Sequence, residues 1–358
     1  MADSVADSHG YGVAIIGAGA MSRERIKIYK ALNRPITAIY SHHTDKAVAL
    51  VEEFGLTGQT KVFDSISSFW EYEKSSYVYI ATSNDSHCNY ATEAMLHDRN
   101  VLVEQMMVCS ISELAKIHEC LKNSKKIIME ANPTLTSPLL NSFGEVIRGH
   151  ESFEDIGRPT NVCISLGKSN PKFVRDDFLR YKINLSDGVL FNLGGYAIGA
   201  AVSLLGTHVE VVNSHLDISR EYHVGVNAHI ILRNRFGVSV TITISNVSNL
   251  PCVLDIGGTN GFYFARDFIH AQSYNCCMNG DAPEARDLTS RFDKESGICR
   301  KTFENDSEYN FAMQILQFEK LQENGYDSCM AGNRNHFKES KAVFRIITEV
   351  MANNYSDV

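Results

Sequence analysis

The sequence predicts an α/β protein with an N-terminal doubly wound parallel sheet and a C-terminal α+β domain that contains a large, open, mostly antiparallel sheet. Three observations support this prediction. Short apolar runs alternate with helical segments up to about residue 132, as in a parallel sheet. Longer β-rich runs dominate after residue 133. The chain has 358 residues, which is more than one core usually supports, so two domains are expected.

In the N-terminal part, strands are expected where short runs are almost wholly apolar or β-branched, because such runs fit a sheet buried on both faces. Helices are expected between these runs. Thr44 and Gly55 are expected to cap the second helix. The predicted strands are 13–16, 36–40, 62–63, 77–81, 101–104 and 126–130, and the predicted helices are 24–32, 45–54, 67–72, 89–97 and 111–121. The domain is expected to span 11–132, after a polar tail over 1–10.

In the C-terminal part, the predicted strands are longer and mostly contiguous, which favours antiparallel pairing. A hairpin connection is expected over 232–237. The predicted strands are 160–166, 209–217, 224–236, 238–247, 253–256 and 261–264, and the predicted helices are 137–148, 194–205, 309–324 and 336–352. We expect an α+β substrate and oligomerisation domain over 133–340, followed by a C-terminal helix and tail over 341–358.

Composition excludes several classes of protein. The formal net charge is -8 and no dense basic run occurs, so no nucleic-acid partner is expected. The longest apolar run, near 197–205, is about half the length needed to cross a bilayer, and the N-terminus does not resemble a signal peptide. The nine cysteines are scattered, which favours free thiols and a cytoplasmic location. No metal site is expected, because no ligand set surrounds His42 and His43.

A glycine-rich turn follows the first predicted strand. Gly17 permits a tight turn, and Gly19 lets the backbone approach a pyrophosphate. Ala20 and Met21 follow in the same turn, and the first N–H groups and positive dipole end of the helix expected over 24–32 favour phosphate. Ser22 replaces the third glycine of the usual pattern and is small enough for close helix–strand packing. The sequence therefore predicts a Rossmann dinucleotide site, with a purely structural turn as the alternative.

The end of the second predicted strand bears on the choice of cofactor. NAD-binding domains usually carry Asp or Glu there, to hold the ribose hydroxyls. Here the first acid is Asp45, which is expected in the following helix. Ser41 and His42 are suited to a 2′-phosphate, which favours NADP over NAD. Alternatively, they are polar loop residues and either cofactor binds.

Several segments in order give the chain a resemblance to a known family. It resembles the glucose–fructose oxidoreductase/inositol dehydrogenase/MocA-type family over nearly its whole length. Residues 79–87 are similar to the family's A-T-P-x-x-x-H segment, with Ser83 in place of proline, and residues 101–106 are similar to its V-L-x-E-K-P signature. The segments that carry the resemblance read IIGAGAM (15–21), YIATSNDSH (79–87), VLVEQM (101–106), MEA (129–131) and GVLFNLGGY (188–196).

The resemblance implies hydride transfer between a nicotinamide and a carbonyl or hydroxyl group, often on a sugar or polyol. In the family a lysine of the E-K-P motif and a later Tyr or His handle the proton. This sequence has Gln105 at the lysine position and Asn192 at the usual aspartate position, while Tyr196 is retained. Glutamine only hydrogen-bonds, so Tyr196 is a weaker base here but can still donate a proton. We expect Tyr196 and Gln105 to be the catalytic pair.

The resemblance also implies the remaining site residues. Those expected near the cofactor, besides the glycine turn and the end of the second strand, are Thr82, Asn84, His87 and Glu104. Those expected at the substrate are Lys168, Lys172 and Asn192, with a solvated loop as the alternative for the lysines. In this family the open sheet pairs subunits, which implies a homodimer or tetramer.

Three functions remain open at this point. The first is an NAD(P)-dependent oxidoreductase that acts on a sugar-like or specialised-metabolite substrate. The second is a non-catalytic dinucleotide-binding sensor or regulatory protein, which the loss of the lysine and the aspartate favours. The third is an enzyme that uses bound NAD(P) transiently for a net non-redox reaction.

Overall fold

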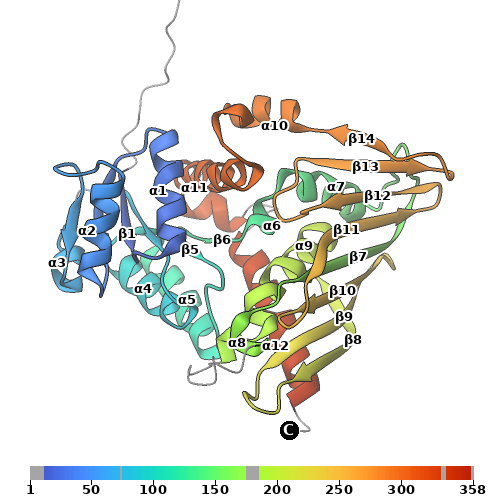
Figure 1. Cartoon of the computed structure of the whole chain (residues 1–358), viewed down its shortest axis with the longest axis horizontal. Coiled ribbons are helices and arrows are strands. Elements are labelled where there is room, and N and C mark those ends of the chain that lie inside the picture. The colour runs from blue at the N-terminus through green and yellow to red at the C-terminus, as the bar shows by residue number, and fades with distance from the viewer. Residues whose placement is uncertain (1–11, 73–74, 175–184, 332–335, 356–358) are drawn as a thin grey trace, which may run out of the picture. The chain divides into compact units, whose positions relative to one another are not determined.

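The computed structural model describes residues 12–72, 75–174, 185–331 and 336–355 (Figure 1). The chain divides into two compact units, each built from two stretches of sequence. The first unit contains the residues up to Ala131 together with residues 301–335. The second contains residues 132–300 and those from His336 onward.

The first unit contains a six-stranded sheet in the order β3-β2-β1-β4-β5-β6, and all its strand pairs are parallel. The order reverses at β1 and β4, the point at which doubly wound sheets bind ligands. The strands are β1 (Val13–Ile16), β2 (Ile36–Tyr40), β3 (Lys61–Phe63), β4 (Tyr77–Ile80), β5 (Asn100–Glu104) and β6 (Ile128–Ala131). The helices are α1 (Ala20–Ala31), α2 (Thr44–Glu53), α3 (Ile66–Trp70), α4 (Asn84–Leu96) and α5 (Ile111–Ser124). The parallel sheet predicted from sequence is confirmed.

A helix from late in the sequence also belongs to the first unit. It is α11 (Asp306–Ala331), which contacts α1. Phe318 of α11 is fully buried and packs edge-on against the ring of Tyr77 at a centroid distance of 5.1 Å. Sequence analysis placed the 309–324 helix in the C-terminal domain. It lies in the first unit because its apolar residues are buried there, and the local pattern does not show which unit buries them.

The second unit contains an eight-stranded sheet in the order β14-β13-β12-β11-β7-β10-β9-β8. Its neighbours are antiparallel except for β7 and β10, which are parallel. The strands are β7 (Pro159–Gly167), β8 (Val209–Ile218), β9 (Gly225–Asn234), β10 (Ser239–Ser245), β11 (Leu250–Gly258), β12 (Gly261–Arg266), β13 (Ser273–Met278) and β14 (Glu284–Asp287). The hairpin expected at 232–237 joins β9 to β10. Sequence analysis missed β13 and β14, whose residues are mixed in polarity and only partly buried.

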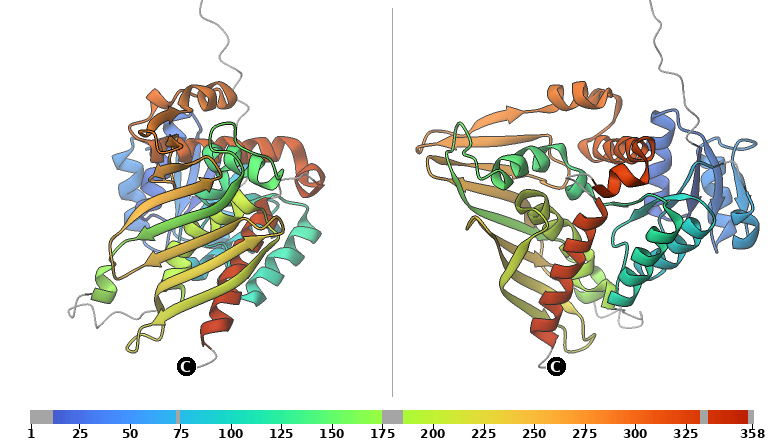
Figure 2. Two further views of the ribbon diagram at one scale, coloured as in Figure 1. Left: turned by 90° about the vertical axis from the view of Figure 1, so that its right-hand side faces the viewer. Right: turned by 180° about the vertical axis from the view of Figure 1, so that it is seen from behind.

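Helices cover one face of this sheet. Burial alternates along β9, as expected for a sheet covered on one face: Ile230 and Leu232 are fully buried, while Ile231 between them is exposed. Helix α9 contacts β7, β9 and β10, and α12 contacts β8. Figure 2 (left) looks onto the opposite, uncovered face. The helical elements that begin in this unit are α6 (Pro133–Thr136), α7 (Pro138–Arg148), α8 (Pro171–Val174), η2 (Leu185–Asp187), η3 (Leu190–Gly194), α9 (Gly195–Leu205), α10 (Thr289–Ser296), η4 (Arg300–Thr302) and α12 (His336–Tyr355).

Three global features bear on function. Within the described ranges, every helix is too short or too polar to cross a bilayer. All nine cysteines are free, as predicted. Among the residues that the structure describes, no His, Cys, Asp and Glu side chains gather into a group of three or more that could hold a metal ion.

Candidate active site

The turn between β1 and α1 has the geometry of a phosphate cradle. Gly17 has a φ of +114°, and a Cβ there would overlap the carbonyl oxygen of Ala81, so only glycine fits. A Cβ at Gly19 would meet no protein atom within 4 Å. Gly19 caps α1, and no side chain caps the helix start. The first N–H groups of α1, from exposed Ala20 and half-buried Met21, therefore begin beside open space, and this arrangement fits a bound pyrophosphate.

Ser22 holds this turn together from inside. Its side chain is fully buried, and its Oγ donates to the Gly17 carbonyl oxygen at 3.0 Å. The serine therefore does more than fill the position of the third glycine, because it ties the first turn of α1 to the end of β1.

The loop after β2 is polar and carries no carboxylate before Asp45. Ser41 is buried, and its Oγ accepts from the His43 N–H at 3.1 Å. The ring of exposed His42 is held by two tyrosine hydroxyls: that of Tyr40 lies 3.2 Å from Nδ1 and that of Tyr90 lies 2.9 Å from Nε2. Helix α2 begins directly afterwards without a side-chain cap. A fixed histidine beside an uncapped helix start is suited to an added phosphate.

His87 joins two loops of the first unit. Its Nδ1 lies 2.9 Å from the carbonyl oxygen of Met106, and its Nε2 lies 3.2 Å from that of Thr82. Burial lowers the pKa of His87 below its ordinary value, and the two carbonyl contacts offset only part of that effect. Thr82 and Asn84 are half-buried in the same loop region, at the carboxyl end of β4. His87 therefore positions the loop that contains Gln105.

Glu104 ends β5, and one oxygen of its carboxylate accepts from three donor groups of the protein. Its Oε1 accepts from Nε and Nη2 of Arg25, at 3.1 and 2.8 Å, and from the Tyr79 hydroxyl at 2.6 Å. Arg25 is fully buried and also donates to Oε1 of Gln314 at 2.5 Å, while its guanidinium lies 4.2 Å from the ring centroid of Phe311. Burial is the largest single effect and lowers the pKa of Arg25, but Glu104, Tyr79 and Tyr29 together outweigh it. The net shift of the pKa is therefore upward, and Arg25 is charged. Sequence analysis missed Arg25.

Gln105 follows at the position where the family has lysine. The side chain is half-buried, and among the described residues its Oε1 is buried without a hydrogen-bond partner. The Gln105–Met106 peptide bond is cis. An unsatisfied buried acceptor is costly, so a donor group on a bound molecule would stabilise it.

In the second unit, Tyr196 and Asn192 lie four residues apart on one continuous helical run. Asn192 is in the π-helical turn η3, and Tyr196 is the second residue of α9. Asn192 is exposed and donates from Nδ2 to Oδ1 of Asn246 at 3.3 Å. Tyr196 is half-buried, and its backbone carbonyl accepts from the Thr134 hydroxyl at 3.0 Å.

Asn246 connects the predicted substrate residues. It is fully buried, and its carbonyl oxygen accepts from the N–H of Asn170 at 2.7 Å. Lys168, two residues earlier, is exposed at the end of β7 and bonds through its N–H to Ser245. The structure thus brings Lys168 and Asn192 to one edge of the sheet around Asn246. Sequence analysis missed Asn246, although a polar side chain directly after an apolar strand is a usable signal. The side chain of Lys172 lies outside the described part of the structure.

Comparisons with known proteins show which family the two units resemble. The profile of an oxidoreductase family with an NAD-binding Rossmann fold matches residues 11–132, and the profile of a GFO/IDH/MocA C-terminal domain matches residues 153–264. The uncharacterised oxidoreductase YgjR of Escherichia coli is 21% identical over 282 residues, which cover 77% of this chain and 81% of that protein.

Two further proteins carry more specific names. The D-xylose 1-dehydrogenase (NADP(+)) 2 of Haloferax volcanii is 22% identical over 86% of this chain and 87% of its own length. The crystal structure of KijD10, a 3-ketoreductase from Actinomadura kijaniata in complex with NADP and TDP-benzene, superimposes with a TM-score of 0.75. That match covers 97% of this chain and 98% of the other at 18% identity, so it shows a shared fold.

Proposed function

Because the chain belongs to the oxidoreductase family with an NAD-binding Rossmann fold and a GFO/IDH/MocA C-terminal domain, we propose that it catalyses NADP-dependent hydride transfer at a carbonyl or hydroxyl group. The observation that carries the proposal is the uncapped start of α1, where a Cβ on Gly19 would meet open space. The substrate is a sugar-like or specialised metabolite. The dehydrogenase and the ketoreductase among the similar proteins support this substrate class.

NADP is the cofactor because of the loop after β2. It offers Ser41, the fixed ring of His42 and the uncapped start of α2, all suited to a 2′-phosphate. The carboxylate that would hold free ribose hydroxyls is missing there. Ala20, Met21, Thr82, Asn84 and Glu104 complete the cofactor side, with Glu104 acting from its fixed position beside Arg25.

The bound nicotinamide supplies or accepts the hydride. Tyr196 donates a proton from its hydroxyl to the substrate oxygen during carbonyl reduction. Gln105 orients the substrate by hydrogen bonding, and its unpartnered Oε1 accepts from a substrate hydroxyl. Since Gln105 is neutral and holds no acidic proton, it cannot take part in proton transfer as a lysine would. Lys168 and Asn192 bind the polar groups of the substrate, and Lys172 is assigned with them from sequence.

Titration of the purified protein with NADPH and NADH, followed by nicotinamide fluorescence, tests the cofactor assignment. We expect NADPH to bind more tightly, and Gly19→Trp to abolish binding because the indole fills the space in front of the helix. A panel of free and nucleotide-linked keto sugars then tests turnover. If neither nucleotide binds at concentrations well above the usual micromolar range, the proposal is wrong.

The Tyr196→Phe variant tests the proton donor. We expect kcat for carbonyl reduction to fall about a hundredfold or more, because a general acid typically contributes that much. The affinity for NADPH should stay unchanged. An unchanged kcat would remove Tyr196 from the mechanism and leave the cofactor assignment intact.

A second candidate is a non-catalytic dinucleotide-binding regulatory protein, or an enzyme whose net reaction is non-redox. The observation that favours it is the replacement of the motif lysine and aspartate by Gln105 and Asn192. Nicotinamide binding without consumption across the whole panel would favour this candidate. Product formation without added reductant would single out the non-redox enzyme. For each of these candidate functions, the nine free cysteines favour a location in the reducing cytoplasm.

A further inference from the structure

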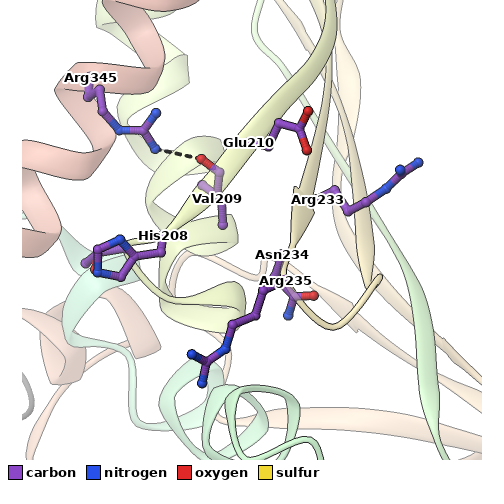
Figure 3. A pocket seen from close by; sticks show the side chains of 8 residues that line it. His208, Val209, Glu210, Arg233, Asn234, Arg235 and Arg345 are labelled. Atoms are coloured by element: carbon purple, nitrogen blue, oxygen red, sulfur yellow. Dashed lines mark hydrogen bonds between the residues drawn. The ribbon is translucent and has the colours of Figure 1, made fainter.

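The second unit contains a cavity of about 460 Å³ that nothing above assigns. It lies where the chain leaves α9 and enters β8, against the end of β9 and one side of α12 (Figure 3). Its size is in the range of small-molecule sites. Residues from three separated stretches of the sequence line it: Thr207, His208, Val209, Glu210, Arg233, Asn234, Arg235 and Arg345.

The lining is strongly basic. Three arginines and a histidine face one acid, Glu210. Glu210 lies directly opposite Arg233 in the β8–β9 register, so these two side chains offset each other on one side of the strands. In Figure 3 the side chains of Glu210 and Arg233 point to one side of β8, while those of Arg345, His208 and Arg235 lie on the other. The second side is therefore cationic.

Arg345 and Arg235 are held in place. Nη2 of Arg345 donates to the Val209 carbonyl oxygen at 2.8 Å, and Nη1 pairs with Glu349 at 3.0 Å. The guanidinium of Arg235 lies 4.6 Å from the ring centroid of Phe236, and among the described residues it has no ion-pair partner. The charge of Arg235 is thus not compensated by an acid. Because the ring contact already restrains the side chain, little conformational entropy is lost when an anion binds.

One residue of the lining, Asn234, carries a buried donor. Asn234 is 6% exposed, and its Oδ1 accepts from the N–H groups of Phe236 and Val238, each at 3.0 Å. Its Nδ2 is buried and has no hydrogen-bond partner within the described structure. Because both bonds to Oδ1 fix the amide, Nδ2 points away from the hairpin turn. An unpartnered buried N–H group is a further reason to expect an acceptor from a bound molecule.

We propose that this cavity binds the phosphate group of a small molecule, or free phosphate. The donors are two guanidinium groups, an imidazole, the Thr207 hydroxyl and the Asn234 amide, and they come from different elements. A tetrahedral oxyanion accepts from several directions, whereas a planar carboxylate accepts mainly in its own plane. Tyr196 is at the start of α9 and His208 follows its end, about 16 Å away for an 11-residue helix. The cavity is therefore separate from the Tyr196 position.

Calorimetric titration of the full-length protein with inorganic phosphate tests the proposal. The protein is first saturated with NADP⁺, so that the phosphate positions of the cofactor are occupied. We expect saturable binding that Arg235→Gln and Arg345→Gln each weaken about tenfold, the usual cost of one charge-assisted contact. Arg235→Gln is the decisive variant because its side chain supports no backbone group, whereas Arg345 also holds Val209.

A matched control accompanies these variants. Arg291→Gln removes an arginine from an exposed pair with Glu295 at the same helical spacing as the pair of Arg345 and Glu349. Arg291 does not line the cavity, so this variant should bind phosphate like the wild type. Equal binding by the wild type and Arg235→Gln, or no saturation by phosphate, would overturn the proposal.

Further ligands identify the source of the phosphate. Tighter binding of a sugar phosphate than of inorganic phosphate, with the same loss in Arg235→Gln, would show that the cavity takes a phosphorylated metabolite. Equal affinity would show that it takes the free ion. Binding of acetate in preference to both would contradict the assignment to phosphate. Failure of NADP⁺ to bind would count against the proposed function alone, because the variants still report on the cavity.

Discussion

The least expected residue in the first unit is Arg25, a fully buried cation on the Rossmann helix. Its neutralising partner is Glu104, at the carboxyl end of β5. The two charges are held by further polar groups from Tyr79 and Gln314, so the network connects α1, two strands and α11. Glu104 precedes Gln105, and we therefore regard Arg25 as a positioning residue for the loop that contains Gln105.

Replacing Arg25 by glutamine tests this role. The variant leaves the buried Glu104 carboxylate without its cation, so we expect the free energy of unfolding to fall by about 3 to 5 kcal/mol. Chemical denaturation measures it. Arg23→Gln is the matched control, because Arg23 is on the same helix but forms its ion pair with Glu53 at the surface. The control should change stability by less than about 0.5 kcal/mol. Equal effects would mean that the buried pair has no special role.

Because of His87, the free energy of unfolding is expected to depend on pH. Burial lowers its pKa in the folded state, so the unfolded chain binds a proton that the folded chain resists. The free energy of unfolding should therefore decrease as the pH falls below the ordinary histidine pKa of about 6.5, and the decrease should stop below the folded pKa.

Unfolding curves of the wild type and His87→Gln between pH 7.5 and pH 5 measure this effect. We expect the variant to be less stable at pH 7.5 but to lose less stability on acidification. His43→Gln, at an exposed site, is the control and should follow the wild-type slope. Parallel curves for the wild type and His87→Gln would contradict the assignment.

At the scale of single residues, the glycine turn was easier to predict from the sequence than the buried charge network around Arg25. The buried face of α1 includes Ser22, Arg25, Ile26 and Tyr29, which is the spacing of an inward helical stripe. The position of Arg25 was thus readable from periodicity. Its partners were not, because Gln314 is 289 residues away. Asn246 was missed for a similar reason, since its contacts come from segments distant in sequence.

The two glycines of the β1–α1 turn are required for different reasons. Gly17 is required by the fold, because it has a positive φ and its hydrogen faces the Ala81 carbonyl. Gly19 borders open space and is required only where a ligand approaches. The two residues therefore predict different phenotypes for the same substitution.

We expect Gly17→Ala to reduce the free energy of unfolding by about 2 kcal/mol or more, because both the backbone conformation and the contact become unfavourable. Gly19→Ala should leave stability almost unchanged and weaken NADPH binding. Thermal unfolding and fluorescence titration of both variants measure the difference. If Gly19→Ala binds NADPH as well as the wild type does, the pyrophosphate does not lie against this residue.

Most elements could be predicted because their patterns are local. The alternation of apolar strands and helices up to residue 131 gave the parallel sheet, and the contiguous β-rich runs gave the open antiparallel one. Strands β13 and β14 were not predicted because their residues are mixed in polarity, and a partly buried strand near the sheet edge needs few apolar residues. The pairing of β7 with β10 is parallel and joins strands far apart in sequence, which no local pattern specifies.

At the scale of the whole molecule, the uncovered sheet face bears on assembly. Ile231 and Phe262 are exposed on it, while Ile230, Leu232 and Tyr263, which are adjacent to them in the strands, are buried on the covered face. Val212 on β8 is also exposed. Exposed apolar side chains on a broad sheet favour a subunit interface. We propose that this face pairs two copies of the chain.

Light scattering coupled to size-exclusion chromatography tests this proposal. We expect a dimer or tetramer for the wild type and a shift toward monomer for Phe262→Glu and Ile231→Glu. Leu96→Glu is the control, because Leu96 is 71% exposed and belongs to the first unit, which does not contain this sheet. A wild-type monomer at micromolar concentration would contradict the proposal. Dissociation by Leu96→Glu alone would place the interface elsewhere.

The late return of α11 to the first unit has a consequence for how the protein is made. Gln314 and Phe311 leave the ribosome almost 290 residues after Arg25, which is about 15 to 60 seconds later at ordinary rates of translation. During that interval the pair of Arg25 and Glu104 lacks part of its cover, and Tyr77 lacks Phe318. The part of the first unit that is made early therefore waits, with apolar surface exposed, for a helix that is translated much later, and such exposed surface is what chaperones recognise.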